Sequence, residues 1–205
     1  MRKLICSALM INCLMLTGCA GIEQQVRSHS QELYEADAVR MTAQIQADHG
    51  DTVECYTLEY SFDGNRWSAL VTEPDILAGI TVHMDGDGSK LEFDGVMLAA
   101  GDILSNGVTA VGSVPLVWET LRTGSLDCVW EEGGLLAGTY VYDDTIGMSV
   151  WYTAEGLPIA AELTENGIGK VSCHFTNVEI DTKDSGNETT DETNLGGNRP
   201  EGSGT

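Results

Sequence analysis

The sequence predicts an α+β protein that is mainly β, with an antiparallel sheet covered by an N-terminal helix and a short middle helix. Three observations predict this class. Between residues 53 and 178, apolar side chains recur mostly at every second position, which is the period of a half-buried strand. Turn sequences such as Asp63-Gly64-Asn65 and Asn166-Gly167 separate these stretches at short intervals. Two further stretches carry helix signals instead.

The first helix is expected over residues 20 to about 50. Its apolar positions follow the four-three-four spacing of one helical face: Tyr34, Ala38, Met41 and Ile45. Gly50 follows as a stop signal. The first part, from Ala20 to about Ser30, is open to two interpretations, an ordered helix or a tether.

The remaining elements follow in order along the chain. The middle helix is expected to begin at Ser113-Val114-Pro115, with the serine as cap and the proline in the first turn, and to close at Gly124. The expected strands cover residues 56–62, 67–71, 80–84, 91–93, 95–99, 126–130, 138–142, 148–152, 159–163 and 171–175. Asp85-Gly86-Asp87-Gly88 is interpreted as a hairpin turn. A calcium loop is disfavoured because Lys90 stands where glycine is needed and Val96 where a bidentate carboxylate is needed.

The N-terminus has the layout of an exported lipoprotein. Arg2 and Lys3 precede an apolar run that is too short to span a membrane and that ends at Leu16-Thr17-Gly18-Cys19. This ending resembles the bacterial lipobox, after which the cysteine is lipidated. The sequence therefore predicts a signal peptide over residues 1–18, lipidation of Cys19, and attachment to the extracytoplasmic face of the cell membrane. An ordinary signal peptide cut nearby is the alternative.

The charge limits what the protein binds. The chain has 32 acidic and 10 basic residues, a net charge of -22. Removing residues 1–18 takes away Arg2 and Lys3 and no acid, so -22 becomes -24. Nucleic-acid binders carry a basic footprint, so nucleic acid is not expected as a partner. Protein charge also gives no attraction to anionic head groups, so the membrane link is expected to be the lipid on Cys19.

The chain divides into four parts. Residues 1–18 are the signal peptide, 19–50 the lipidated cysteine, tether and N-terminal helix, 51–181 the sheet domain, and 182–205 an acidic tail too poor in apolar residues to fold. Within the domain, Cys55, Cys128 and Cys173 are an odd number. We expect Cys128 and Cys173 to face inward and to be unbonded, because their strands are the first and last of a five-strand meander.

The sequence contains no recognisable catalytic or metal-binding constellation. The four histidines are scattered, and neither a nucleophile elbow nor a phosphate loop is present. No cofactor, metal or catalytic residue is therefore expected. The aromatic residues are the better indication of function, because strand phasing places a large set on one side of the sheet: Tyr56, Tyr60, Trp67, Phe93, Trp130, Tyr140 and Phe175. They predict either an ordinary core under the helices or an open apolar hollow that binds a ligand.

The order of elements resembles the lipoprotein-carrier (LolA-like) superfamily. The resemblance covers most of residues 30–178 and rests on residues 56–74, Leu77-Ala78-Gly79-Ile80, Ser113-Val114-Pro115 and residues 156–163. It implies an open half-barrel whose apolar concave face accommodates acyl chains. The soluble carriers of that superfamily lack a lipid anchor, and their functional arginine matches no position of this chain.

Two functions therefore remain open from the sequence. The first is a non-enzymatic, membrane-anchored lipoprotein that binds a lipid or an acylated partner in the apolar concave face. The second is a cell-envelope sensory or interaction module whose core is closed. Whether the aromatic residues border empty space decides between them.

Overall fold

The fold is an open antiparallel sheet with two helices on one side. The computed structural model describes residues 17–103 and 107–182. The helices are α2 (Thr17–Tyr34) and α3 (Ser113–Thr123). The strands are β1 (Ala36–Asp48), β2 (Val53–Phe62), β3 (Trp67–Glu73), β4 (Thr81–Asp85), β5 (Gly88–Phe93), β6 (Val96–Gly101), β7 (Ser125–Glu132), β8 (Leu135–Val141), β9 (Ile146–Tyr152), β10 (Pro158–Glu165) and β11 (Ile168–Thr182). The predicted class, a mainly β fold with a curled sheet, an N-terminal helix and a middle helix, is confirmed.

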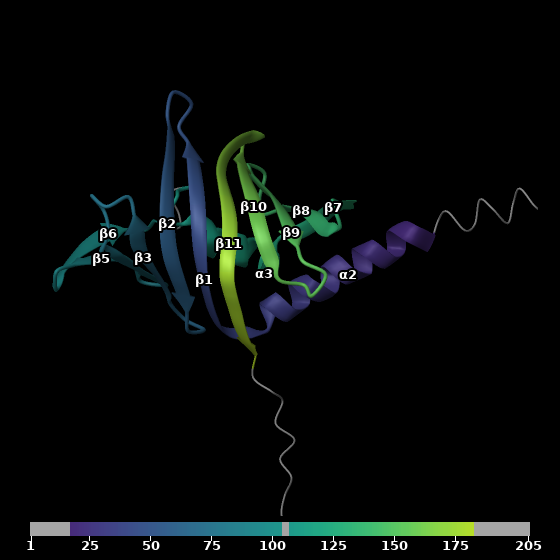
Figure 1. The fold of residues 1–205 in the computed structure, drawn as a ribbon, viewed down its shortest axis with the longest axis horizontal. Coiled ribbons are helices and arrows are strands. Elements are labelled where there is room, and N and C mark those ends of the chain that lie inside the picture. Colours follow the sequence, from purple (N-terminus) through teal and green to yellow (C-terminus); the bar gives the residue numbers. More distant parts are fainter. Residues whose placement is uncertain (1–16, 104–106, 183–205) are drawn as a thin grey trace, which may run out of the picture.

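Two meanders join in the middle of the sheet. The strand order is β6-β5-β4-β3-β2-β1-β11-β10-β9-β8-β7, so the first and last strands of the domain are neighbours. Their register places Ala43 opposite Phe175 and Ile45 opposite Cys173. Figure 1 shows β1 and β11 side by side at the centre and α3 behind the sheet. Helix α2 contacts α3, β7 and β8, and α3 also contacts β8, β10 and β11.

The prediction of a helix through residue 50 is wrong for its second half. The helix ends at Tyr34, and Ala36–Asp48 is strand β1, which pairs on both sides. The spacing of Tyr34, Ala38, Met41 and Ile45 fits a helix, but a period of two accounts for more of the apolar residues. The side chains buried on the core side of β1 are Val39, Met41, Ala43, Ile45 and Ala47.

The stretch expected as either tether or helix is helical. Helix α2 runs through Thr17–Tyr34, and its Val26 and Leu33 are buried against the domain. Because these residues and the partly buried Ile22 recur at helical spacing, α2 docks one face on the sheet and exposes the others. No helix in the described part of the chain is long and apolar enough to cross a membrane.

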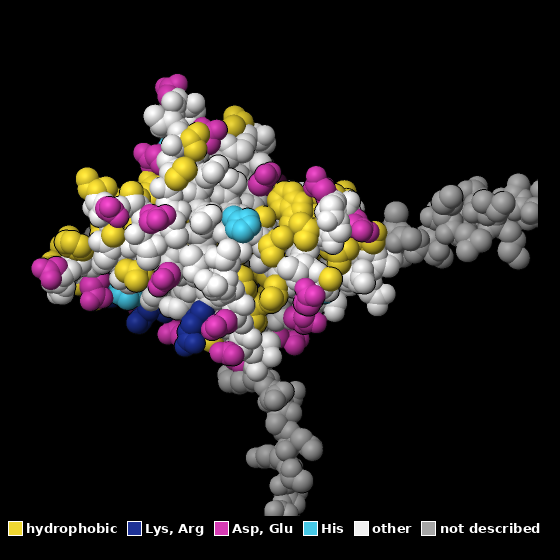
Figure 2. Space-filling view, in the orientation of Figure 1, with side chains coloured by type: hydrophobic (Ala, Val, Ile, Leu, Met, Phe, Trp, Pro, Cys, Tyr) yellow, Lys and Arg dark blue, Asp and Glu magenta, His cyan; other side chains and the backbone are white. Residues whose placement is uncertain are grey.

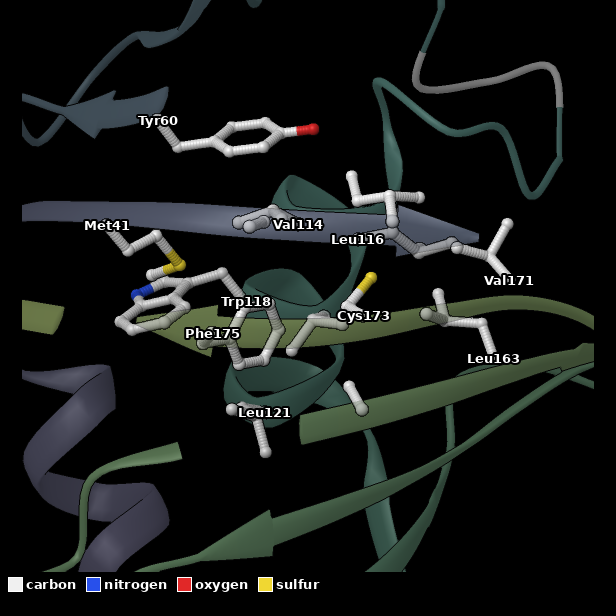
Figure 3. Close-up of a cluster of buried hydrophobic side chains, with 14 of the residues drawn as sticks. Met41, Tyr60, Val114, Leu116, Trp118, Leu121, Leu163, Val171, Cys173 and Phe175 are labelled. Atoms are coloured by element: carbon white, nitrogen blue, oxygen red, sulfur yellow. The ribbon is translucent and has the colours of Figure 1, made fainter. Parts of the chain in front are cut away.

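Helix α3 fills the space inside the sheet. Its Val114, Val117 and Trp118 are buried, and Figure 3 shows side chains of α3 meeting Met41 of β1 and Phe175 of β11. Burying one large apolar side chain contributes about 1.5–3 kcal/mol, so this packing is a main source of stability. The helix begins differently from the prediction: Gly112 is the N-cap residue, and the Ser113 hydroxyl donates to the Ala110 carbonyl at 2.7 Å.

The hairpin turns predicted from the sequence are present. Asp85 pairs with Gly88 across the β4–β5 turn, which confirms a turn at Asp85-Gly86-Asp87-Gly88. Asn166 and Gly167 join β10 to β11 with φ angles of 53° and 74°, as a two-residue turn with a left-handed backbone requires. Among the described residues, no group of three or more histidine, cysteine, aspartate or glutamate side chains is placed to hold a metal ion.

Candidate functional site

Four of the predicted ligand-binding residues belong to the packed core: Tyr60, Trp67, Tyr140 and Phe175. Trp67 stacks on Phe62 with ring centroids 4.9 Å apart and meets Trp118 of α3 edge-on at 5.9 Å. The Tyr60 hydroxyl donates to the Val111 carbonyl at 2.9 Å, just before α3. These rings therefore hold α3 on the sheet instead of facing an empty hollow.

Tyr140 connects helix α2 to the sheet. Its hydroxyl lies 2.6 Å from the Ser30 hydroxyl of α2 and 2.9 Å from the Tyr152 hydroxyl of β9. Burial raises the pKa of both tyrosines above the ordinary value, so both hydroxyls stay protonated near neutral pH. The three hydroxyls hydrogen-bond one another where the half-buried Ser30 meets the sheet, as partly or fully buried polar groups usually require.

Trp130 faces the other side of the sheet, so the prediction for this residue is wrong. Leu126 pairs with Tyr140, but Cys128 pairs with Thr139, so Asp127 is an extra residue in a β-bulge. A bulge reverses the alternation, which turns Cys128 and Trp130 outward and leaves Cys128 exposed.

On the outer face Trp130 packs against another tryptophan. It meets Trp151 of β9 edge-on, with centroids 5.9 Å apart and planes at 89°. Both indole N–H groups donate to the same Oε2 atom of Glu132, at 3.4 and 3.3 Å. Figure 2 views this outer face and shows hydrophobic side chains gathered over the region of β8 to β10.

The last two predicted residues are not fully buried. Phe93, at the end of β5, is 56% exposed, and Tyr56 of β2 is half-buried, with its hydroxyl donating to Glu54. That hydrogen bond is the main reason that the pKa of Tyr56 is raised. The structure thus brings Tyr60, Trp67, Tyr140 and Phe175 into one core and packs the half-buried Tyr56 against it. It leaves Phe93 exposed and Trp130 on the outer face.

The core reaches the surface at one end of the sheet, in a cavity of 570 Å³ that we call the terminal cleft. Its walls come from the β2–β3, β4–β5 and β8–β9 turns and from the first turns of α3. Its floor contains Phe62, Trp67 and Leu116, each 8% exposed, and Ile146, which is 9% exposed. These are the largest exposed fractions among the buried hydrophobic residues that the structure describes.

Charged side chains form the rim of the terminal cleft. Asp143 accepts hydrogen bonds from the backbone N–H groups of Thr145 and Ile146, both at 2.7 Å, and these bonds lower its pKa. Asp85 lies 3.5 Å from the Arg66 guanidinium, and Arg122 of α3 also lines the cavity. An apolar floor with a polar rim is the usual form of a site for an apolar ligand.

Sequence analysis missed this cleft because it lies between turns far apart in the chain. The only signals that point to it are Phe62, Trp67 and Met84, which end or begin strands next to turns. Apolar residues at strand ends have no neighbouring strand residue beyond them to complete their burial. Their meeting in one cavity depends on how β2, β3 and β4 are paired, and the sequence pattern alone does not give it.

Sequence analysis also missed a hydrogen-bonded chain on the outer face. The Ser68 hydroxyl lies 3.0 Å from His83 Nδ1, and His83 Nε2 lies 3.0 Å from Glu92 Oε2. The chain crosses β3, β4 and β5. A serine, histidine and carboxylate in contact resemble a hydrolase triad, but acyl transfer also needs preorganised oxyanion donors. Strand β3 pairs with β2 and β4, so its backbone N–H groups belong to the sheet. The chain is best explained as a cross-strand ladder.

The protein is a mainly β protein of the α+β class. Its open antiparallel sheet packs on two helices and has a cleft with an apolar floor at one end. No model of a known protein family matches the sequence, and no curated protein matches it by sequence. Several solved structures are similar to it. A LolA superfamily protein from Nitrosomonas europaea has a TM-score of 0.42 and 10% identity, covering 76% of this chain and 93% of that chain.

Two other similar structures come from lipoproteins or a lipoprotein complex. Lipoprotein LppX from Mycobacterium tuberculosis has a TM-score of 0.45 and 12% identity, covering 79% of this chain and 99% of that one. A chain of the complex between the CwlD amidase and the GerS lipoprotein from Clostridioides difficile has a TM-score of 0.41 and 14% identity, covering 77% and 94%. All three similarities are at 14% identity or less.

Proposed function

We propose that this protein is a non-catalytic, membrane-anchored lipoprotein that binds a lipid or an acylated partner in the terminal cleft. The observation that supports the proposal is the partial exposure of four core residues in one cavity. Phe62, Trp67, Leu116 and Ile146 come from four separate elements, yet their exposed surfaces meet in the same 570 Å³ space. Sites for small ligands typically have volumes of about 300–1,000 Å³ and mainly apolar linings.

The proposed ligand site is the terminal cleft, at the end of the sheet, and not the concave face expected from the sequence. The concave face under α3 is occupied by Val114, Val117 and Trp118, so an acyl chain has no room there without moving the helix. Trp67 is the member of the predicted aromatic set that lines the terminal cleft. Tyr60 and Phe175 belong to the packed core, and Tyr60 meets Trp67 edge-on.

Attachment through Cys19 fits the position of α2. Residues 1–16, which carry most of the predicted signal peptide, lie outside the described residues, as does the predicted tail from residue 183 onward. Cys19 lies in the first turns of α2, and Ile22 already packs against the domain. Helix α2 would therefore connect the lipid on Cys19 directly to the domain. Two or three acyl chains give stable anchoring, because each buried methylene contributes about 0.8 kcal/mol.

The alternative is an interaction module with a closed core, and edge strand β6 favours it. Val96, Met97 and Leu98 of β6 are 59%, 55% and 61% exposed, and Val96–Gly101 carries no charge or proline. Charged residues or proline usually protect natural edge strands, because an unprotected edge can pair with a strand of another chain. A partner protein adding a strand along β6 would use this edge.

Displacement of a fluorescent fatty-acyl probe tests the proposal. Leu116→Phe adds a ring to the floor of the terminal cleft, and Leu98→Phe makes the same change on the β6 edge. We expect Leu116→Phe to weaken probe binding at least tenfold and Leu98→Phe to leave it unchanged, with both variants folded by circular dichroism. Native mass spectrometry of the protein as purified should detect a bound lipid that delipidation removes. No probe binding by the wild-type protein would reject the lipid-binding function and favour the module.

A further inference from the structure

A second cavity lies between the two helices, beside the terminal cleft. It has a volume of 490 Å³ and is lined by Arg27, Ser30 and Tyr34 of α2, by Leu121 and Arg122 of α3, and by residues of β7 and β8. We call it the α2–α3 groove. It is distinct from the terminal cleft and includes the contact between Ser30 and Tyr140 described above.

The groove is basic in a strongly acidic protein. The chain has 32 acidic side chains and only 10 basic ones, so a cavity would ordinarily show more carboxylates than guanidinium groups. The α2–α3 groove instead has two arginines and no carboxylate among its lining residues. Arginine presents a fork of N–H donors that matches carboxylate and phosphate oxygens.

Both guanidinium groups contact neighbouring side chains. Arg122 lies over the Tyr34 ring, 5.3 Å from its centroid. Arg27 donates from Nε and Nη2 to Glu23 Oε1, at 3.0 and 2.8 Å, in a pair that is about half exposed on both sides. An exposed pair of this kind contributes little to stability, so Arg27 can turn to another anion at small cost.

The wall of the groove next to the arginines is both apolar and hydroxylated. Leu121 and Leu126 supply apolar surface, and the Ser30 and Tyr140 hydroxyls lie 2.6 Å from each other. Burial raises the pKa of Tyr140, and this rise is opposed by the hydrogen bonds with Ser30 and Tyr152 and by the nearby positive charge of Arg27. A head group entering the groove therefore meets positive charge and hydroxyl groups together.

Arg122 joins the groove to the terminal cleft, since its side chain lines both cavities. We propose that the α2–α3 groove binds the carboxylate or phosphate head of an amphiphile whose acyl chain lies in the terminal cleft. This inference rests on the proposed function and names its ligand class. The occupant is a single molecule and not a membrane surface, because the net charge of -22 repels an extended anionic surface while two arginines can hold one head group.

The test compares how well four compounds displace the fluorescent acyl probe: decanoate, decyl phosphate, decanol and inorganic phosphate. Each compound is used below the concentration at which it aggregates. The proteins are wild type, Arg27→Gln/Arg122→Gln, and Arg40→Gln as a control for lost charge, since Arg40 is exposed on β1. In the wild type, at least one of the two anions should bind about tenfold more tightly than decanol, as two charge-assisted hydrogen bonds allow. The double variant should abolish that advantage, and Arg40→Gln should preserve it.

The outcomes separate the inference from the function on which it rests. Equal binding of decanol and both anions, or equal losses in the double variant and Arg40→Gln, would overturn the anion site while leaving acyl binding intact. Displacement of the probe by inorganic phosphate at the same concentration would show that the ligand needs no acyl chain, contrary to the inference. Binding of none of the four compounds would overturn the proposed function itself. The order of decanoate and decyl phosphate distinguishes a fatty acid from a phospholipid as the source of the head group.

Discussion

The imidazole of His29 on helix α2 lies directly against the backbone of Gly156, in the turn between β9 and β10. A Cβ atom on Gly156 would stand 2.3 Å from His29 Nδ1, closer than atoms can approach. The His29 ring also lies 6.0 Å from the Tyr152 ring, centroid to centroid. Helix α2 is thus seated on the sheet through a contact that requires glycine.

Gly156→Ala should therefore destabilise the protein more than an ordinary turn substitution. Gly156 has a φ of 89°, and holding another residue in such a conformation costs about 1–3 kcal/mol. The clash with His29 adds to this cost. Each kcal/mol lowers the melting temperature by roughly 2–4 °C for a domain of this size, which thermal denaturation measures. Gly167→Ala is the control, because Gly167 has a φ of 74° but open space around it. Equal losses in the two variants would show that the His29 contact is unimportant.

Trp67 and Trp130 should differ sharply when each is replaced by alanine. Trp67 packs against Phe62 and Trp118 in the core, so Trp67→Ala should lower the free energy of unfolding by about 3–5 kcal/mol. Trp130 contributes an outer-face contact to Trp151, and an aromatic pair adds about 0.5–1.5 kcal/mol beyond its buried area. Urea denaturation measures both losses. A core-like loss in Trp130→Ala would mean that the bulge at Asp127 is absent.

The three domain thiols should be free and should fall into two classes of reactivity. Cys55 and Cys128 are exposed, whereas Cys173 is buried, and burial raises its pKa to about 12. Since the thiolate is the reactive form, a disulfide reagent should modify two thiols in the native protein and the third only after unfolding. Strands β7 and β11 are four steps apart, about 19 Å at 4.8 Å per step, too far for a bond between Cys128 and Cys173. Finding one free thiol under denaturing, non-reducing conditions would contradict the strand order.

Asp143 should stabilise the β8–β9 turn only while it is ionised. Backbone N–H groups of Thr145 and Ile146 lower its pKa from the ordinary value of 3.8. The folded state therefore favours the carboxylate, and this stabilisation is present above the unfolded pKa and is lost as the pH falls through the lower, folded pKa. Asp143→Asn should lower the melting temperature at neutral pH, and the difference should shrink on acidification below pH 3.8. Asp51→Asn, an exposed carboxylate in the β1–β2 turn, is the matched control. A difference that persists at the lowest pH would assign the effect to geometry instead of charge.

Cys19→Ala should release the protein from the membrane fraction without unfolding it. The net charge of -22 gives no attraction to anionic head groups, so the lipid is the expected attachment. Fractionation followed by circular dichroism of the released protein measures both points. A variant that still sediments with membranes after a salt wash would show that a protein partner or another segment holds it there.

Local sequence signals predicted the hairpins and the middle helix, because Asp-Gly and Asn-Gly turns act over a few residues. The same signals failed for β1, whose apolar residues fit both a helical face and an alternating strand until pairing with β11 decides between them. They failed again at Asp127, where one extra residue reverses every later side chain of β7. The terminal cleft depends on the packing of distant turns, so the pattern of aromatic residues did not predict it.

The pairing of β1 with β11 has a consequence for the newly made chain. These central strands are joined across 135 positions, as between Thr42 and Asn177, so β1 is among the first elements to emerge during synthesis and its partner is the last. Until then β1 presents a long unpaired edge with apolar side chains, the kind of surface that aggregates and that chaperones recognise. Such distant pairing also slows folding, because a large loop must close first. The middle of this sheet can therefore form only after β11 has been synthesised.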